Sequence, residues 1–196
     1  MSADPLMQSG PASREEGKAV AAEHYNAQAR RVITGVDENG RSAIIGDEFT
    51  PRRATAPAFT VCDIWETQAL PIPMDTPAAV GEVSIYPPKT GFTFRVCTFP
   101  PDSEYDKEAA YKESLDALQG GGTFREESEI PGMHVHDTLD IVTVVSGELH
   151  IVLETGETLL RQGDSVIVRG VLHSWSNKTD KPVVLTSLMM SASVDR

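Results

Sequence analysis

The chain is poor in several kinds of residue, and each shortage excludes a class of protein. Basic residues are scarce, because 17 Lys and Arg stand against 29 Asp and Glu, which gives a formal net charge of −12. Nucleic acids and anionic membrane surfaces are bound through basic patches, so neither is expected as a partner. No apolar run approaches the roughly 20 residues that a membrane-spanning helix needs.

The chain also has few cysteines, and its start does not resemble a signal sequence. Cys62 and Cys97 are the two cysteines of the chain, and so few in a chain of this size favour buried reduced thiols over a disulfide. The first twenty residues lack a basic start followed by an apolar core, so no secretory signal is expected and the predicted location is cytoplasmic. A Gly-rich phosphate loop, a G-x-S-x-G elbow and a Cys-x-x-Cys pair are also missing.

The length of 196 residues suits one domain with a real core. We expect residues 1–30 to form a flexible or helical N-terminal extension and residues 31–196 to form the domain. Residues 13–30 suit a surface helix with Ser13 as its N-cap. His24 has no ligand-type neighbour there, so it is expected to be a solvated surface histidine.

Short β-branched runs separated by turn residues dominate the domain. Residues 31–48 predict a hairpin around Asn39-Gly40, because an Asn-Gly pair supplies the positive φ of a tight turn. Residues 59–67 and 91–99 predict two strands joined by a Pro-rich connection. From Ile130 onward, strands and turns alternate at nearly regular spacing, which predicts an antiparallel sandwich or barrel.

One helical segment, residues 103–122, interrupts the strands. Ser103 and Asp106 resemble a capping box, and three glycines end the segment. A surface insertion is the favoured interpretation, and a lid or a dimer contact are the alternatives. Three apolar side chains share one helical face: Tyr111, Leu115 and Leu118.

The segment MHVHDTLD places three potential metal ligands at even positions: His134, His136 and Asp140. Residues two or four apart on a strand share a face, so all three would point into the barrel. Burying them without partners would cost on the order of several kcal/mol, and a divalent ion removes that cost. His173 comes after a Val/Ile strand that can lie beside them, and such a site keeps open coordination positions, as catalytic sites do.

At these residues the sequence resembles the cupin superfamily. Its first motif has the form G-x5-H-x-H-x3,4-E-x6-G, and His134, His136 and Gly147 match it. Asp140 stands where the family usually has Glu, so its carboxylate has a shorter reach. Three interpretations stay open for Asp140: a ligand with shifted geometry, a ligand through water, or no ligand. Ser128 replaces the opening Gly of the motif.

The second cupin motif has the form G-x5-P-x-G-x2-H-x3-N, and Gly163, His173 and Asn177 match it. The Pro-x-Gly has become Arg169-Gly170, one residue shorter. Arg169 is a candidate for binding a substrate carboxylate or enolate, because its fork suits planar anions. An exposed turn arginine is the alternative interpretation.

Four further residues have weaker assignments from the sequence. Trp175 lies two residues beyond His173 and is either a pocket wall or part of the core. Asn177 could face inward, but the residue at this place in the motif more often stabilises a turn by hydrogen bonds. Arg95 is a candidate substrate contact, and His150 is expected to be an ordinary strand residue.

The resemblance covers roughly residues 85–192 and implies an all-β fold: a single cupin-type antiparallel β-barrel (jelly roll) with a helical N-terminal extension and one helical insertion. It also implies a homodimer. The implied function is that of a metal-dependent enzyme acting on a small oxygen-rich organic substrate. The ion would be Fe, Mn, Ni or Zn, held by His134, His136, Asp140 and His173, and Arg169 and Trp175 would contact the substrate.

The resemblance gives the fold and the metal more firmly than the reaction. A dioxygenase is preferred. A Lewis-acid isomerase, decarboxylase or lyase is the first alternative. A non-catalytic metabolite-binding cupin is the second.

Overall fold

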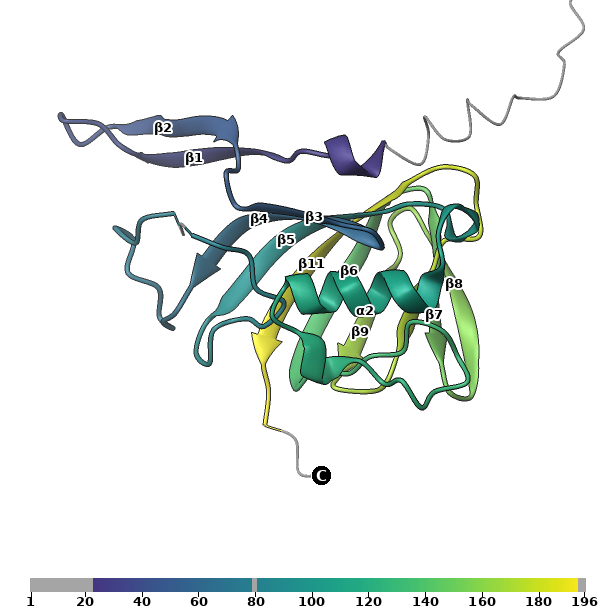
Figure 1. Ribbon diagram of the computed structural model, residues 1–196. Coiled ribbons are helices and arrows are strands. Elements are labelled where there is room, and N and C mark those ends of the chain that lie inside the picture. Colours follow the sequence, from purple (N-terminus) through teal and green to yellow (C-terminus); the bar gives the residue numbers. More distant parts are fainter. Residues whose placement is uncertain (1–22, 79–80, 194–196) are drawn as a thin grey trace, which may run out of the picture.

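The computed structural model describes residues 23–78 and 81–193 (Figure 1). No helix within these two ranges is long and apolar enough to span a bilayer. Short 3-10 helices occur at His24–Asn26, Asp102–Glu104 and Gly121–Thr123, and α2 is at Lys107–Ala117. The strands are β1 (Arg30–Val36), β2 (Ser42–Phe49), β3 (Arg53–Ala56), β4 (Phe59–Thr67), β5 (Phe92–Phe99), β6 (Thr138–Ser146), β7 (Glu148–Leu153), β8 (Gly156–Arg161), β9 (Ser165–Arg169), β10 (Ser174–Ser176) and β11 (Val183–Ser191).

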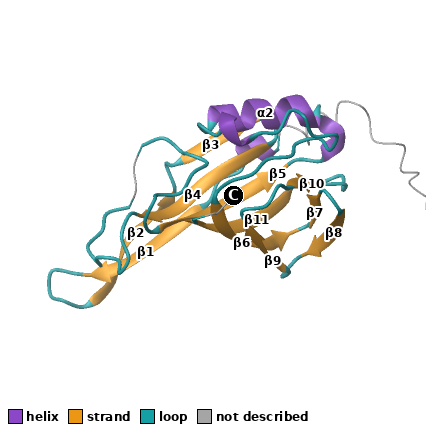
Figure 2. Ribbon diagram, turned by 90° about the horizontal axis from the view of Figure 1, so that it is seen from below, coloured by secondary structure: helices purple, strands orange, loops and turns teal. Residues whose placement is uncertain are grey.

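Two antiparallel sheets face each other across a common core (Figure 2). The larger sheet has the order β3-β4-β5-β11-β6-β9, and the smaller has the order β10-β7-β8. Apolar side chains of both sheets belong to one buried cluster, including Val61 and Leu185 of the larger sheet and Leu149 and Trp175 of the smaller. The predicted cupin-type antiparallel barrel is therefore confirmed.

Strand alternation determines which side chains enter the core. On β6 the side chains of Thr138, Asp140, Val142 and Val144 are buried, and those between them are more exposed. The same period of two on β11 buries every second residue from Val183 to Met189. Polar residues at inward positions are thereby placed inside the barrel together with aliphatic ones.

The two cysteines lie on adjacent strands of the larger sheet. Cys62 is on β4 and Cys97 on β5, and both are buried free thiols. This agrees with the expected reduced state. Burial raises the pKa of the Cys97 thiol to about 12, which keeps this thiol protonated and unreactive at neutral pH.

The predicted hairpin is formed by β1 and β2, which pair only with each other. Gly40 supplies the expected positive φ of 75°. Asp37 closes the turn, since its Oδ1 accepts hydrogen bonds from the backbone N–H groups of Asn39 and Arg41, both at 2.9 Å. The hairpin projects beyond the barrel in both views (Figures 1 and 2) and exposes several apolar side chains: Val32, Val36, Ile44, Ile45 and Phe49.

The N-terminal predictions are partly outside the described residues and partly wrong. The expected helix over residues 13–30 lies outside them up to residue 22, and the residues after that form one short 3-10 turn before β1 begins at Arg30. His24 is not solvated but 2% exposed. Its Nε2 lies 3.1 Å from the carbonyl oxygen of Ala56, because the segment before β1 packs on β3 and β4.

The N-terminus of α2 differs from the predicted capping box. Asp106 alone is the N-cap, and its Oδ1 accepts a hydrogen bond of 3.1 Å from the backbone N–H of Ala109. Ser103 lies in the preceding 3-10 helix, so it cannot cap α2. The helix begins three residues later than the capping-box prediction because Pro101 starts a separate turn there.

The apolar face of α2 is buried as predicted, with Tyr111, Leu115 and Leu118 each 1% exposed. The helix is a surface insertion with an exposed outer face, as predicted, but its inner face belongs to the barrel interior, because Tyr111 and Leu115 line the cavity. The Tyr111 hydroxyl donates a hydrogen bond of 3.2 Å to the carbonyl of Trp175 on β10. The helix therefore forms one wall of the barrel interior (Figure 1).

Truncation of this wall should destabilise the protein. We expect Leu115→Ala to lower the free energy of unfolding by about 2–5 kcal/mol, because it removes a fully buried side chain from a packed core. Glu113→Ala, two residues away on the exposed face of α2, is the matched control and should change it by less than about 0.5 kcal/mol. Urea unfolding of both variants measures the difference, and equal effects would show that α2 does not pack on the barrel.

Candidate metal site

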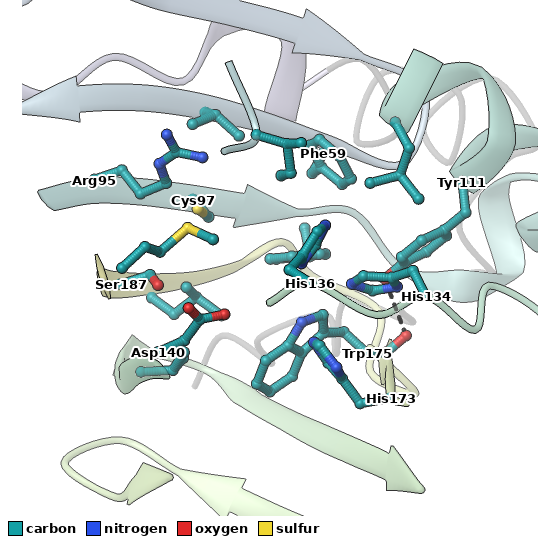
Figure 3. Close-up of a pocket in the computed structure, with 17 residues that line it drawn as sticks. Phe59, Arg95, Cys97, Tyr111, His134, His136, Asp140, His173, Trp175 and Ser187 are labelled. Carbon is teal, nitrogen blue, oxygen red and sulfur yellow. Dashed lines mark hydrogen bonds between the residues drawn. The ribbon is translucent and has the colours of Figure 1, made fainter. Parts of the chain in front are cut away.

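A cavity of about 60 Å³ lies inside the barrel, between the two sheets and α2. Its walls are mostly apolar, with Phe59, Val142 and Leu185 among them, and five Arg, His and Asp side chains interrupt them (Figure 3): Arg95, His134, His136, Asp140 and His173. A group of ionisable residues in a mostly apolar cavity is typical of a functional site.

Backbone pairing brings two histidines from distant parts of the chain together. The N–H of His134 donates to the carbonyl of His173 at 2.9 Å, and the N–H of His173 donates to the carbonyl of His134 at 3.0 Å. Their ring centroids are 4.4 Å apart. The ring of His136 lies on the same face, 5.2 Å from that of His134 and 6.4 Å from that of His173. The three predicted histidines therefore converge.

Two of the three imidazoles have a fixed tautomer. Nδ1 of His134 lies 2.9 Å from the carbonyl oxygen of Gly132, and Nδ1 of His173 lies 2.8 Å from that of Val171. A carbonyl oxygen can only accept, so each Nδ1 carries the proton and each Nε2 keeps a free lone pair. Such a bond also fixes the orientation of a metal-binding ring. Both ring nitrogens of His136 are buried and have no hydrogen-bond partner among the described residues.

Burial keeps these imidazoles uncharged. It lowers the pKa of His134 well below its usual value, and the neighbouring His173 and His136 lower it further. Burial likewise lowers the pKa of His136 to about 3, with contributions from His173 and Arg95. The pKa of His173 is lowered for the same reason. Neutral imidazoles with free lone pairs are the form that binds a metal ion.

Asp140 lies in the same cavity but apart from His134 and His173. Figure 3 shows Asp140 and Arg95 toward one end, those two histidines toward the other, and His136 between them. Burial raises the pKa of Asp140 to about 6, against the opposing effects of a hydrogen bond with Thr138 and the charge of Arg95. Its Oδ1 is buried without a hydrogen-bond partner in the part of the chain that the structure describes.

Within residues 23–78 and 81–193, no three His, Cys, Asp or Glu side chains are arranged as a metal site. The chemistry of the donors nevertheless fits a divalent ion. Two lone pairs are freed by backbone hydrogen bonds, and both nitrogens of His136 lack a partner among these residues. Imidazole nitrogens suit Fe, Ni, Cu and Zn, so His134, His136 and His173 are the residues that would hold the ion.

The two predicted substrate contacts have different outcomes. Trp175 lines the cavity, with its ring 5.7 Å from that of His173, so it is a pocket wall. Arg169 is exposed at the end of β9 and is not among the lining residues. The reason is strand parity: Val168 pairs with Asp140 and faces inward, so Arg169 faces outward. Arg169 thus lies outside the cavity, as the alternative of an exposed arginine expects, and a role in binding anions at the barrel mouth stays a prediction.

The remaining weaker predictions agree with the structure. Asn177 ties its turn, because its Nδ2 donates to the carbonyls of Phe99 at 3.2 Å and Lys181 at 2.8 Å. His150 lies on β7, outside the cavity. Arg95 lines the cavity, as its alternation on β5 allows.

Sequence reasoning missed several cavity residues. Ser187 and Met189 line the cavity together with Leu185, and their alternation on the predicted last strand could have identified them. Tyr111 had a recognisable buried helical face, but no local pattern indicates which cavity a helix covers.

Comparison with known proteins places these motifs in a family. Residues 123–189 match the model of the cupin domain. Two proteins of Diaporthe leptostromiformis, phomopsin biosynthesis cluster proteins C' and D, are 35% identical over 68 residues and 36% identical over 67 residues. Each match covers 32% of this chain. The chain spans only about a third of the length of these relatives, 36% and 35%.

Solved structures with a similar arrangement include the cupin domain of Schizosaccharomyces pombe Cnp3, with a TM-score of 0.45 and 9% identity over 84% of this chain and 89% of that one. A putative ethanolamine utilization protein from Salmonella typhimurium has a TM-score of 0.40 and 13% identity over 85% of this chain and 99% of that one. The segment matched by the family model contains all three convergent histidines. Residues 123–189 therefore carry a cupin domain, which supports the resemblance to the cupin superfamily.

Proposed function

We propose that this chain is a metal-dependent cupin enzyme that acts on a small, oxygen-rich organic substrate, and that its reaction is a dioxygenation. The observation that supports this proposal is the convergence of three uncharged imidazoles, with unused nitrogens, in one buried cavity. Such groups are costly to bury without a partner, and a divalent ion is the partner that suits all three.

Each element of the cavity has a part in this proposal. The carbonyls of Gly132 and Val171 orient the two imidazoles that they bind. Trp175 and Tyr111 form walls that exclude bulk water. The Oδ1 atom of Asp140 is free to accept a hydrogen bond from a substrate hydroxyl. A bound ion supplies dioxygen chemistry if it is iron, and Lewis-acid polarisation if it is manganese, nickel or zinc.

The names of two relatives support a role in biosynthesis. The two Diaporthe proteins are named as members of a biosynthesis cluster, which suits chemistry on a small organic molecule. The homodimer that the family resemblance implies stays a prediction.

The purified protein should bind one equivalent of a divalent ion such as Zn or Mn. We expect His136→Ala to weaken the affinity by at least about tenfold, because it removes one of three nitrogen donors. His150→Ala is the matched control, since this histidine lies on the outer side of β7, and it should leave the affinity unchanged. Isothermal titration of the two variants and elemental analysis of the parent protein measure the effect. Equal affinities for the two variants would refute a site at His136.

The metal that supports turnover should distinguish between reaction classes. With iron bound, we expect oxygen uptake on a panel of catechol-like and β-diketone compounds, and His134→Ala should lower it at least about a hundredfold. The zinc-loaded protein should consume no oxygen, which makes it the internal control. Substrate turnover without oxygen uptake would instead support the Lewis-acid alternative. Binding of a compound without turnover under any metal would support a non-catalytic cupin.

A further inference from the structure

Arg95 is a buried cation at the end of the cavity opposite His134 and His173 (Figure 3). It lies on β5 directly opposite Asp63 of β4, and it is 1% exposed. Its Nε lies 3.0 Å from Asp63 Oδ1, and its Nη2 donates a hydrogen bond of 2.8 Å to the carbonyl of Ser84. These two contacts fix the guanidinium through its Nε and Nη2 atoms. Its third nitrogen, Nη1, is buried and has no hydrogen-bond partner among the described residues.

Asp63 is shared between Arg95 and a second buried arginine, Arg52, whereas Asp140, at the same end of the cavity, forms no ion pair with Arg95. Arg52 Nη2 lies 3.0 Å from Asp63 Oδ2 and 3.0 Å from Glu66 Oε2. The network therefore contains two cations and two anions, and its charges balance. Its members hold Arg95 in place, but none of them accepts a hydrogen bond from Nη1. An unmet buried donor of this kind costs about 1–3 kcal/mol, more when the group is charged.

We infer that Arg95 Nη1 binds the carboxylate of the substrate, so that the cavity accepts small organic acids with an apolar body. The inference rests on the proposed function and narrows its substrate class. A guanidinium makes its strongest hydrogen bonds with carboxylates. The walls beside Arg95, from Val61, Cys97 and Leu185, suit a hydrocarbon portion.

The size of the cavity limits the acid. A volume of about 60 Å³ holds roughly four to six water-sized groups, at about 10–15 Å³ for each. An acid of about four carbons is thus the natural probe. Its carboxylate would lie at the Arg95 end, and its other end would face His136.

The charge of the site favours an anion as well. A divalent ion held by three neutral imidazoles keeps its full charge of two, and Asp140 can offset at most one of them. An anionic substrate compensates the positive charge that Asp140 leaves, in a cavity where uncompensated charge is costly.

The surface outside His136 has a matching charge. His136 also lines a surface groove that carries Lys89 and Arg125 against one acidic residue, Asp137. An excess of basic over acidic side chains at this place stands out in a chain of net charge −12. It would raise the local concentration of anions in the surface groove beside His136.

Titration calorimetry with butyrate and butyramide tests the inference, because the two probes have nearly the same shape but only butyrate is charged. We expect the parent protein to bind butyrate about ten- to a hundredfold more tightly. Arg95→Gln should abolish this preference, and Arg95→Lys should retain a part of it, since it keeps the charge but loses the planar fork. Arg169→Gln is the matched control: it removes an exposed arginine outside the cavity and should preserve the preference.

The outcomes separate this inference from the proposed function. Metal content and circular dichroism are measured on every sample, and each titration is repeated after treatment with a chelator. Equal affinity of the parent protein for both probes overturns the inference whether or not the variants fold. A preference that survives Arg95→Gln in a folded protein also overturns it. Loss of the preference with metal content unchanged supports it. If the untreated protein contains no metal and takes up none on titration, but still shows the Arg95-dependent preference, the result contradicts the metal proposal alone.

Discussion

Two hydrogen bonds from imidazole to backbone determine the chemistry of the cavity. The Nδ1 atoms of His134 and His173 donate to carbonyls two residues earlier in each case, Gly132 and Val171. Each bond fixes a ring, assigns its proton and leaves its Nε2 as an unused donor atom. Because burial keeps the rings uncharged, the site offers lone pairs rather than positive charges. A cation is therefore attracted where protonated histidines would repel it.

The two motifs come together because of the pairing between strands, not because of their proximity in sequence. His134 and His173 are joined by reciprocal backbone hydrogen bonds, while β6, the strand within the first motif, lies between β9 and β11. The chain thus places both motifs at one end of the larger sheet. The helix α2 then covers the space between the sheets with Tyr111 and Leu115, so that the imidazoles are buried among mostly apolar side chains.

Local patterns predict most of this fold and the identity of the convergent histidines. The Asn39-Gly40 turn and the parity of His134, His136 and Asp140 each depend on a few neighbouring residues, and all of them are recognisable in the sequence. Other features depend on contacts that no short segment contains. The burial of His24 requires the edge formed by β3 and β4.

The same distinction applies to the positions of the two arginines, Arg169 and Arg95. The place of Arg169 in a motif suggests an anion-binding role, yet the pairing of β9 with β6 turns it outward. Arg95 resembles any charged strand residue in the sequence, and only its pairing with Asp63 across β4 and β5 shows that it is held at the cavity wall. Long-range pairing, rather than residue type, decides both cases.

The central claim is that three imidazoles converge on one ion. Anomalous diffraction from crystals grown with a manganese or zinc salt tests it most directly, because the signal locates the ion without reference to any reaction. The account predicts a single strong peak inside the barrel, bonded to Nε2 of His134, to Nε2 of His173 and to a ring nitrogen of His136. Ordered crystals with no peak in the cavity, or with peaks confined to surface carboxylates, would contradict it.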